Sequence, residues 1–215
     1  MAVLETKRTH TSDDFNDKLY EFLKNEEEIR LSTYDDGFGN LTIGVGYNLN
    51  GNKKWRDDFK NTGIEVSPTA TIKDLKITEE EAKKLFDATI DRYKDKVKNK
   101  IGEEAYNKLE NSDEMITLVS MAFNSRKENF LIGPNLTKAI QNGDRISAWY
   151  EIRYASNKNR DHGIQQRRTR ESEKFGLFKD PSNITVDEAK KVIKFLESKR
   201  EYIERVARLD PLKLL

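Results

Sequence analysis

The sequence predicts an α+β protein that is mostly α-helical, with a small lobe holding a β-hairpin, a long connecting helix, and a helical lobe. Three observations predict it. A hairpin pattern occurs near the N-terminus, at residues 30–47. A long charged segment, residues 78–100, has apolar residues at helical spacing, and this spacing continues from residue 103 to residue 207. At 215 residues, the chain is long enough to bury a sizeable core.

The first helix is predicted at about residues 13–27. Thr11, Ser12 and Asp13 are residue types that favour helix N-caps, and an apolar stripe follows at helical spacing. The residues before the helix, 1–11, read as a flexible arm.

The hairpin follows directly. The segments "RLSTY" (30–34) and "LTIGVGY" (41–47) read as short strands, and "DDGFGN" between them supplies residues suited to turns. Residues 48–76 are polar and read as a connector, with a short strand at "GIEV" (63–66) as one interpretation.

The long helix opens with a capping box from Thr78 to Glu81, in which each side chain bonds the other residue's free backbone amide. Its opposite face is charged, which suits a helix that bridges two lobes. Its apolar stripe consists of Ala82, Leu85, Phe86, Ile90, Tyr93 and Val97.

The remaining chain is punctuated by Gly133-Pro134, Gly143 and Pro181, and a second capping box runs from Thr185 to Glu188. Helices are predicted at residues 103–110, 113–124, 135–141, 144–155, 161–174 and 185–207. The predicted organisation is an arm (1–11), a main domain (12–178, with a small lobe 12–76, a long helix 78–100 and a helical lobe 101–178) and a C-terminal helical extension (179–215).

Composition excludes several classes of function. The net charge is only +1, so no global field favours nucleic acid or an acidic membrane. The chain has no cysteine, and its two histidines, His10 and His162, are far apart, so we expect no metal and no cofactor. No apolar run is long enough to span a bilayer, and the N-terminus lacks a secretory signal. We expect synthesis in a cytoplasm, with any release by another route.

Two carboxyl groups in contrasting surroundings mark the hairpin region. Glu27 falls at the C-terminal end of the first helix, where partial burial and the carbonyl dipoles favour the neutral form that donates protons. Asp36 falls in the hairpin turn, where water and free amides favour the ionised form. Such a pair suits cleavage of glycosidic bonds, with Thr42 helping to hold a water. Spacing alone does not choose between Glu26 and Glu27, and acids in turns are common.

Residues 27–46 resemble the signature of phage-type lysozymes, glycoside hydrolase family 24: a Glu, eight residues, an Asp, five residues, then Thr-Ile-Gly-x-Gly. Glu27, Asp36 and the run from Thr42 to Gly46 fill these positions without a gap. The segments "ITEEEAKKLF", "LVSMAFNS" and "GIQQRRTRESEKFGLF" resemble later parts of the family, so the resemblance covers about residues 15–178. The sequence departs from the family at Glu28, where Gly is usual, and at Tyr47, where His is usual.

The resemblance implies hydrolysis of the β-1,4 bond between N-acetylmuramic acid and N-acetylglucosamine in peptidoglycan. Glu27 would be the general acid, and Asp36 with Thr42 would position the attacking water. The carboxyl separation is then expected in the inverting range of roughly 6.5–9.5 Å. By position in the family, Asn48, Phe123 and Asn135 are the expected substrate contacts.

The same resemblance implies that a basic residue, Arg167 or Arg168, approaches the catalytic Glu, while the other lies on a solvated helix face. The expected partner is the peptidoglycan glycan strand of the cell wall, reached after release from the cytoplasm. We expect no nucleic acid and no membrane insertion. For the C-terminal helix, packing on the helical lobe is the default, with self-association and partner binding as alternatives.

Two other functions fit the same residues. One is a lysozyme-fold protein that binds peptidoglycan or serves a structural role without activity, and the other is a chitin-degrading hydrolase. The sequence does not separate an endolysin, a tail-associated lysozyme and a bacteriocin-like enzyme.

Overall fold

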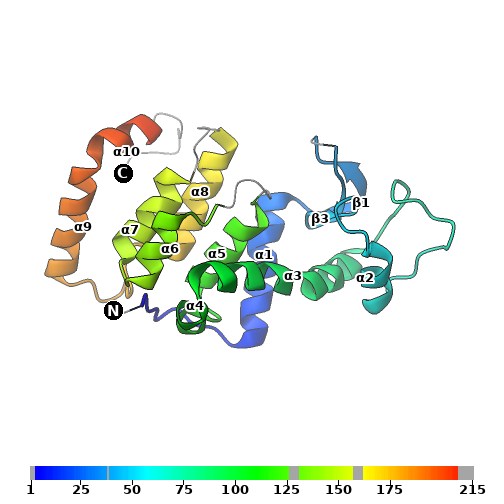
Figure 1. The fold of residues 1–215 in the computed structure, drawn as a ribbon, viewed down its shortest axis with the longest axis horizontal. Helices are drawn as coiled ribbons and strands as arrows, with labels where there is room; N and C mark the ends of the chain where they lie inside the picture. The colour runs from blue at the N-terminus through cyan, green and yellow to red at the C-terminus, as the bar shows by residue number, and fades with distance from the viewer. Residues whose placement is uncertain (1–2, 38, 126–130, 157–161, 208–215) are drawn as a thin grey trace. The chain divides into compact units, whose positions relative to one another are not determined.

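The computed structural model describes residues 3–37, 39–125, 131–156 and 162–207 (Figure 1). It confirms the predicted α+β class, because helices dominate and a small antiparallel sheet accompanies them. Two compact units divide the chain. We call residues 16–93 the hairpin unit, and residues 1–15 with 94–215 the helical unit.

The hairpin unit contains a three-stranded sheet in the order β1-β2-β3, after most of the first helix. The predicted second strand, 41–47, is in fact two strands, because Gly44 and Gly46 both adopt a φ of 65° and reverse the chain between them. The elements are α1 (Ser12–Glu27), β1 (Arg30–Asp35), β2 (Leu41–Gly44) and β3 (Tyr47–Asn48).

The connector contains a helix that the sequence analysis did not predict, α2 (Trp55–Asn61). The strand suggested at residues 63–66 is wrong. Gly63, with a φ of 74°, ends the helix, and the Ile64 amide donates to the Phe59 carbonyl at 2.9 Å. This segment therefore caps α2 instead of pairing with a strand. Ile64 is buried in the core, and Val66 packs against it, partly buried.

The long helix α3 (Glu79–Ile101) confirms the predicted capping box. The Thr78 amide donates to Glu81 Oε2 at 2.7 Å, and the Glu81 amide donates to Thr78 Oγ1 at 3.1 Å. The start of α3 joins the core of the hairpin unit, whose buried members are Ile43, Tyr47, Leu49, Phe59, Ile64, Leu75, Ile77, Ala82 and Leu85.

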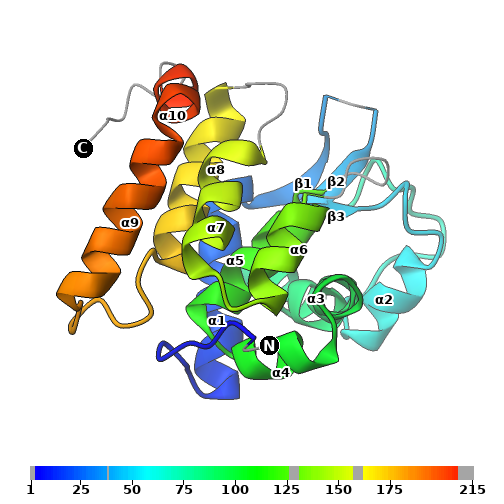
Figure 2. The same cartoon turned by 60° about the vertical axis from the view of Figure 1, so that its left-hand side comes forward.

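The helical unit is built around α5, whose residues are buried from Glu114 to Ala122. Helix α8 packs on α5 and on a short π-helix, η1, that continues from α7 (Figure 2). The predicted helix at residues 144–155 is divided at residue 151, and the predicted helix at residues 185–207 is divided at Lys199. The elements are α4 (Glu103–Leu109), α5 (Asp113–Phe123), α6 (Pro134–Gln141), α7 (Arg145–Tyr150), η1 (Glu151–Ala155), α8 (His162–Phe175), α9 (Val186–Ser198) and α10 (Arg200–Ala207).

The N-terminal segment differs from the flexible arm that the sequence predicts, because residues 3–11 pack on the helical unit. Leu4 is 1% exposed, and its amide donates to the Ile140 carbonyl at 2.9 Å. The carboxylate of Glu114 is fully buried and accepts a hydrogen bond from Arg8 Nη2 at 2.6 Å. A buried carboxylate requires such partners, and the segment supplies one.

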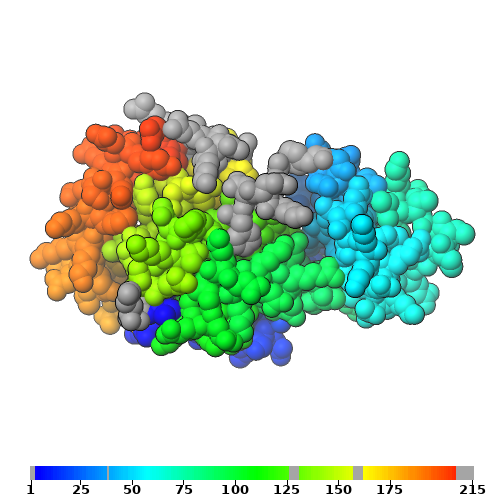
Figure 3. Space-filling view, in the orientation of Figure 1, coloured from blue at the N-terminus to red at the C-terminus, as the bar shows by residue number. Residues whose placement is uncertain are grey.

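The C-terminal helices α9 and α10 pack on the same unit, in line with the default expectation (Figure 3). Val192 is buried, and the rings of Phe195 and Tyr202 lie 5.6 Å and 6.1 Å from that of Tyr150. The outer side of α9 remains apolar in part, with Val186 and Ile193 exposed. Within the described residues, no helix combines the length and apolar character needed to cross a membrane.

Candidate active site

Glu27 is the last residue of α1 and is half-buried. The helix ends there because Glu28 adopts a left-handed backbone with a φ of 56°. Burial raises the pKa of the Tyr34 and Tyr93 phenols, and the negative charge of Glu27 raises both further. Glu27 therefore lies within electrostatic range of two tyrosines of the hairpin unit.

Asp36 directly follows β1, and Asn40 makes two hydrogen bonds to its carboxylate. The Asn40 amide donates to Asp36 Oδ1 at 3.0 Å, and Asn40 Nδ2 donates to Asp36 Oδ2 at 2.9 Å. The charge of Asp36 also raises the pKa of Tyr34, after burial and Glu27. The negative charges of Glu27 and Asp36 thus both raise the pKa of Tyr34, so both carboxylates lie within electrostatic range of this phenol in the hairpin unit.

Thr42 lies in the middle strand and is 5% exposed. It pairs with Tyr34 of β1 on one side and with Asn48 of β3 on the other. Side chains at paired positions share one face of a sheet, so these three form a row across the strands. The Thr42 hydroxyl donates to the Asn40 carbonyl at 3.4 Å.

Asn48 also shapes the turn after β3. Its Oδ1 accepts a hydrogen bond from the Gly51 amide at 2.6 Å. This is the turn-forming behaviour common to asparagine. The side-chain amide nitrogen is the group that remains to be offered to a ligand.

The other two predicted substrate contacts, Phe123 and Asn135, belong to the helical unit. Phe123 ends α5 and is partly exposed. Asn135 lines a cavity of about 430 Å³, and its Nδ2 lies 3.5 Å from Glu151 Oε1. Burial raises the pKa of Glu151 in this cavity. Lys199, between α9 and α10, and Tyr202 of α10 form another part of its wall.

The expectation that Arg167 or Arg168 is solvated is wrong, because both are buried. Arg167 Nε donates to Glu171 Oε1 at 3.2 Å, Arg168 also pairs with Glu171, and Arg168 Nη2 donates to Asn124 Oδ1 at 2.6 Å. Ser120 donates to the same carboxylate at 2.6 Å. Inside the helical unit, this arginine pair ties α8 to α5.

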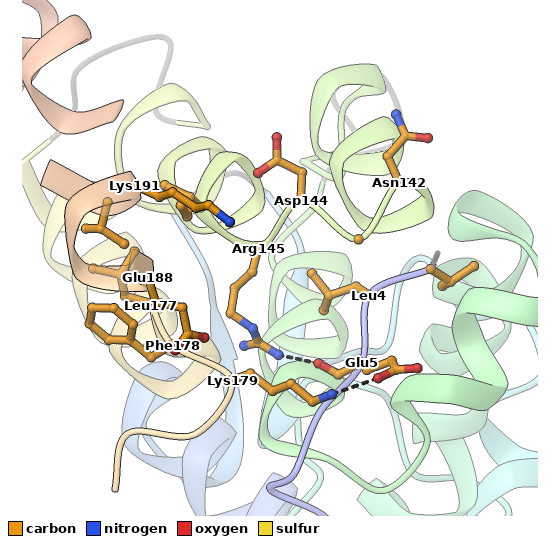
Figure 4. Close-up of a pocket in the computed structure, with 14 residues that line it drawn as sticks. Leu4, Glu5, Asn142, Asp144, Arg145, Leu177, Phe178, Lys179, Glu188 and Lys191 are labelled. Carbon is orange, nitrogen blue, oxygen red and sulfur yellow. Dashed lines mark hydrogen bonds and ion pairs between the residues drawn. The ribbon is translucent and has the colours of Figure 1, made fainter. Parts of the chain in front are cut away.

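A second cavity, of about 410 Å³, contains none of the predicted site residues (Figure 4). Residues 3–5, the turn before α7, the segment 177–179 and α9 line it. Its polar groups serve the packing of these segments. Lys179 Nζ lies 2.7 Å from Glu5 Oε2, and Arg145 Nη2 donates to the Glu5 carbonyl at 2.6 Å.

Asn40 is the residue of this neighbourhood that sequence reasoning missed. An Asp followed four residues later by an Asn within a turn was the available signal, since both side chains favour local hydrogen bonds. Among the described residues, no cluster of three or more His, Asp or Glu side chains is suited to a metal ion.

Comparisons with known proteins identify the family of this chain. The model of the phage lysozyme family matches residues 24–171. A solved structure that resembles this chain is the muramidase domain of SpmX from Asticaccaulis excentricus. It is 18% identical, with a TM-score of 0.47 over 78% of this chain and 98% of that chain. A search of curated proteins finds no match. Because the family model spans well over half of the 215 residues, the chain belongs to the phage lysozyme family.

Proposed function

We propose that this protein is a muramidase that hydrolyses the β-1,4 bond between N-acetylmuramic acid and N-acetylglucosamine in peptidoglycan. One observation carries the proposal: the family match over residues 24–171 includes Glu27 and Asp36, which are spaced as in the family signature.

Glu27 is the proposed general acid. It is half-buried and is the last residue of α1. It protonates the glycosidic oxygen as the bond breaks, which leaves the positive charge on the sugar ring.

Asp36 is the proposed partner for the attacking water. Two N–H groups of Asn40 donate to its carboxylate, and hydrogen bonds to the charged form favour that form. The carboxylate then stabilises the positive charge and, with Thr42, orients the water. An inverting reaction follows from these roles, and NMR of the first product anomer tests it.

Asn48, Phe123 and Asn135 are the proposed substrate contacts. Asn48 extends the row that includes Thr42, so its amide nitrogen would meet sugar beside the proposed water. Phe123 would offer an apolar ring, and Asn135 would offer an amide from its cavity wall. The site of action is the cell wall, after release of the protein from the cytoplasm.

A reaction with two polymers tests this proposal against its alternatives. The protein is incubated with purified peptidoglycan and with chitin oligomers, and mass spectrometry identifies the new reducing ends. Reducing N-acetylmuramic acid from peptidoglycan alone supports a muramidase. Cleavage of chitin alone supports a chitin-degrading hydrolase, and cleavage of neither supports a binding or structural protein.

A further inference from the structure

In the turn between β1 and β2, Asn40 forms hydrogen bonds with both Asp36 and Thr42. Its backbone amide and its Nδ2 donate to the two oxygens of Asp36, at 3.0 Å and 2.9 Å. Its carbonyl accepts both the Asp36 amide, at 3.0 Å, and the Thr42 hydroxyl, at 3.4 Å. One residue therefore contacts the two groups assigned to the attacking water.

The directions of these bonds matter for a water between the two groups. Since each carboxylate oxygen accepts more than one hydrogen bond, Asp36 can accept from a water while Asn40 holds it. The Thr42 hydroxyl points its proton at the Asn40 carbonyl, so its lone pairs are presented to a donor. Both groups are thus set as acceptors.

An unsupported aspartate in a turn samples several rotamers. Loss of geometry by about 1 Å can lower a rate by about a hundredfold. Asp36 is half-buried and lies in a turn, followed by Gly37 with a φ of 80°, so hydrogen bonds help to fix its side chain. The Asn40 side chain supplies that support by a direct hydrogen bond.

We propose that Asn40 is a positioning residue for hydrolysis, which fixes the Asp36 carboxylate through Nδ2. This inference rests on the proposed function. Asn40 acts through Asp36 and does not itself touch the reacting atoms.

Kinetics of Asn40→Ala on peptidoglycan test the proposal. The variant keeps all backbone hydrogen bonds and removes only the Nδ2 donor. We expect kcat to fall about tenfold, the effect of one hydrogen bond to a charged group, with KM within about twofold. The matched control is Asn50→Ala, because Asn50 Nδ2 donates to the Gly39 carbonyl of the same turn at 3.2 Å and not to Asp36. A fall in kcat no larger than that of Asn50→Ala overturns the proposal.

The isostere Asn40→Asp separates positioning from a structural role. Its new carboxyl can donate to Asp36 only when protonated, so activity relative to wild type should rise as the pH falls below about 5. A ratio that stays constant with pH contradicts the proposed contact.

A measurement without substrate distinguishes failure of this inference from failure of the proposed function. Carbon-13 NMR follows the titration of the Asp36 carboxyl in wild type, Asn40→Ala and Asn50→Ala. A higher midpoint in Asn40→Ala alone supports the contact even if the wild type cleaves no peptidoglycan. Equal midpoints in all three proteins reject the contact, whatever the activity.

Discussion

Glu28 occupies a backbone conformation that favours glycine. Its φ of 56° lies in the left-handed region, where a Cβ atom costs about 1–2 kcal/mol. Phage-type lysozymes usually have glycine at this position, and the geometry gives the reason, since the chain must turn sharply from α1 into β1. The exposed side chain gains only an ion pair with Arg30 at 3.0 Å, and surface pairs contribute little.

Glu28→Gly should therefore raise the free energy of unfolding by about 0.5 kcal/mol, because relief of the strain exceeds the added entropy of the unfolded chain. Urea denaturation measures the difference. Glu21→Gly is the matched control, since Glu21 lies exposed in the interior of α1 and its substitution should lower stability by about 1 kcal/mol. Destabilisation by both substitutions to a similar extent would contradict the explanation.

At the residue scale, the sequence could propose Glu27, Asp36 and Thr42 as candidates through their spacing, because the signature is a local sequence pattern. Asn40 could not be predicted, because its contact with Asp36 depends on the rotamers of both side chains. Glu114 and Glu171 escaped for a similar reason, since a charged residue inside a helix gives no sign of burial until its arginine partners are placed.

At the scale of elements, Tyr47 joins β3 to α2 and α3 within the hairpin unit. Its hydroxyl donates to Asp58 Oδ2 at 2.7 Å, and Arg92 Nη2 donates to the same oxygen at 2.7 Å. Burial alone raises the pKa of Asp58, but the hydrogen bonds from Tyr47, Arg92 and Asn52 outweigh it and hold that pKa below its usual range. Tyrosine in place of the family's histidine thus has a structural partner.

Tyr47→Phe should lower the free energy of unfolding by about 1 kcal/mol at pH 7, since the partly buried Asp58 loses one donor. Burial and the Asp58 hydrogen bond raise the pKa of Tyr47 in the folded state. A raised folded pKa stabilises below the unfolded value, about 10, and this contribution is lost as the pH rises toward the folded value. The difference between variant and wild type should therefore shrink above about pH 10.

Denaturation curves between pH 7 and pH 11 measure both effects. Tyr154→Phe serves as the control, because the Tyr154 ring packs on that of Tyr150 at 5.6 Å, away from Asp58. A stability difference for Tyr47→Phe that does not change with pH would reject the role of the hydroxyl.

Most helices could be predicted because apolar residues at a period near 3.6 mark them directly. Helix α2 could not, since only Trp55 and Phe59 interrupt a charged segment. The breaks at η1 and at Lys199 were also invisible. The apolar period continues through them, and only packing against neighbours decides where a helix widens or bends.

At the scale of the whole chain, the N-terminal segment is part of the folded structure. Glu114, with no exposed side-chain surface, pairs with Arg8 at 2.6 Å and with Arg145 at 2.7 Å, and it accepts the Thr6 hydroxyl at 2.7 Å. Residues 1–11 read as an arm in the sequence. Their contacts could not be foreseen, because their main partner, the buried carboxylate of Glu114, lies more than a hundred residues later in the chain.

Arg8→Ala should lower the free energy of unfolding by about 2–3 kcal/mol, near the lower end for breaking a buried pair, because Arg145 still compensates Glu114. Lys7→Ala is the matched control. Its pair with Asp180 is exposed, with 60% of the lysine side chain accessible, so it should cost less than about 0.5 kcal/mol. If both substitutions changed the free energy of unfolding equally, the N-terminal segment would not stabilise the fold through Glu114, and it would behave as the flexible arm that the sequence predicts.

The central claim is that Glu27 donates the proton that breaks the glycosidic bond, and Glu27→Gln tests it most directly. The amide keeps the shape of the side chain and removes the acidic proton. Release of reducing ends from purified peptidoglycan is measured beside thermal unfolding, with Glu26→Gln as the control. The account predicts that Glu27→Gln loses turnover at least about a hundredfold while it unfolds cooperatively, and that Glu26→Gln stays active. Wild-type turnover by a folded Glu27→Gln protein would contradict it.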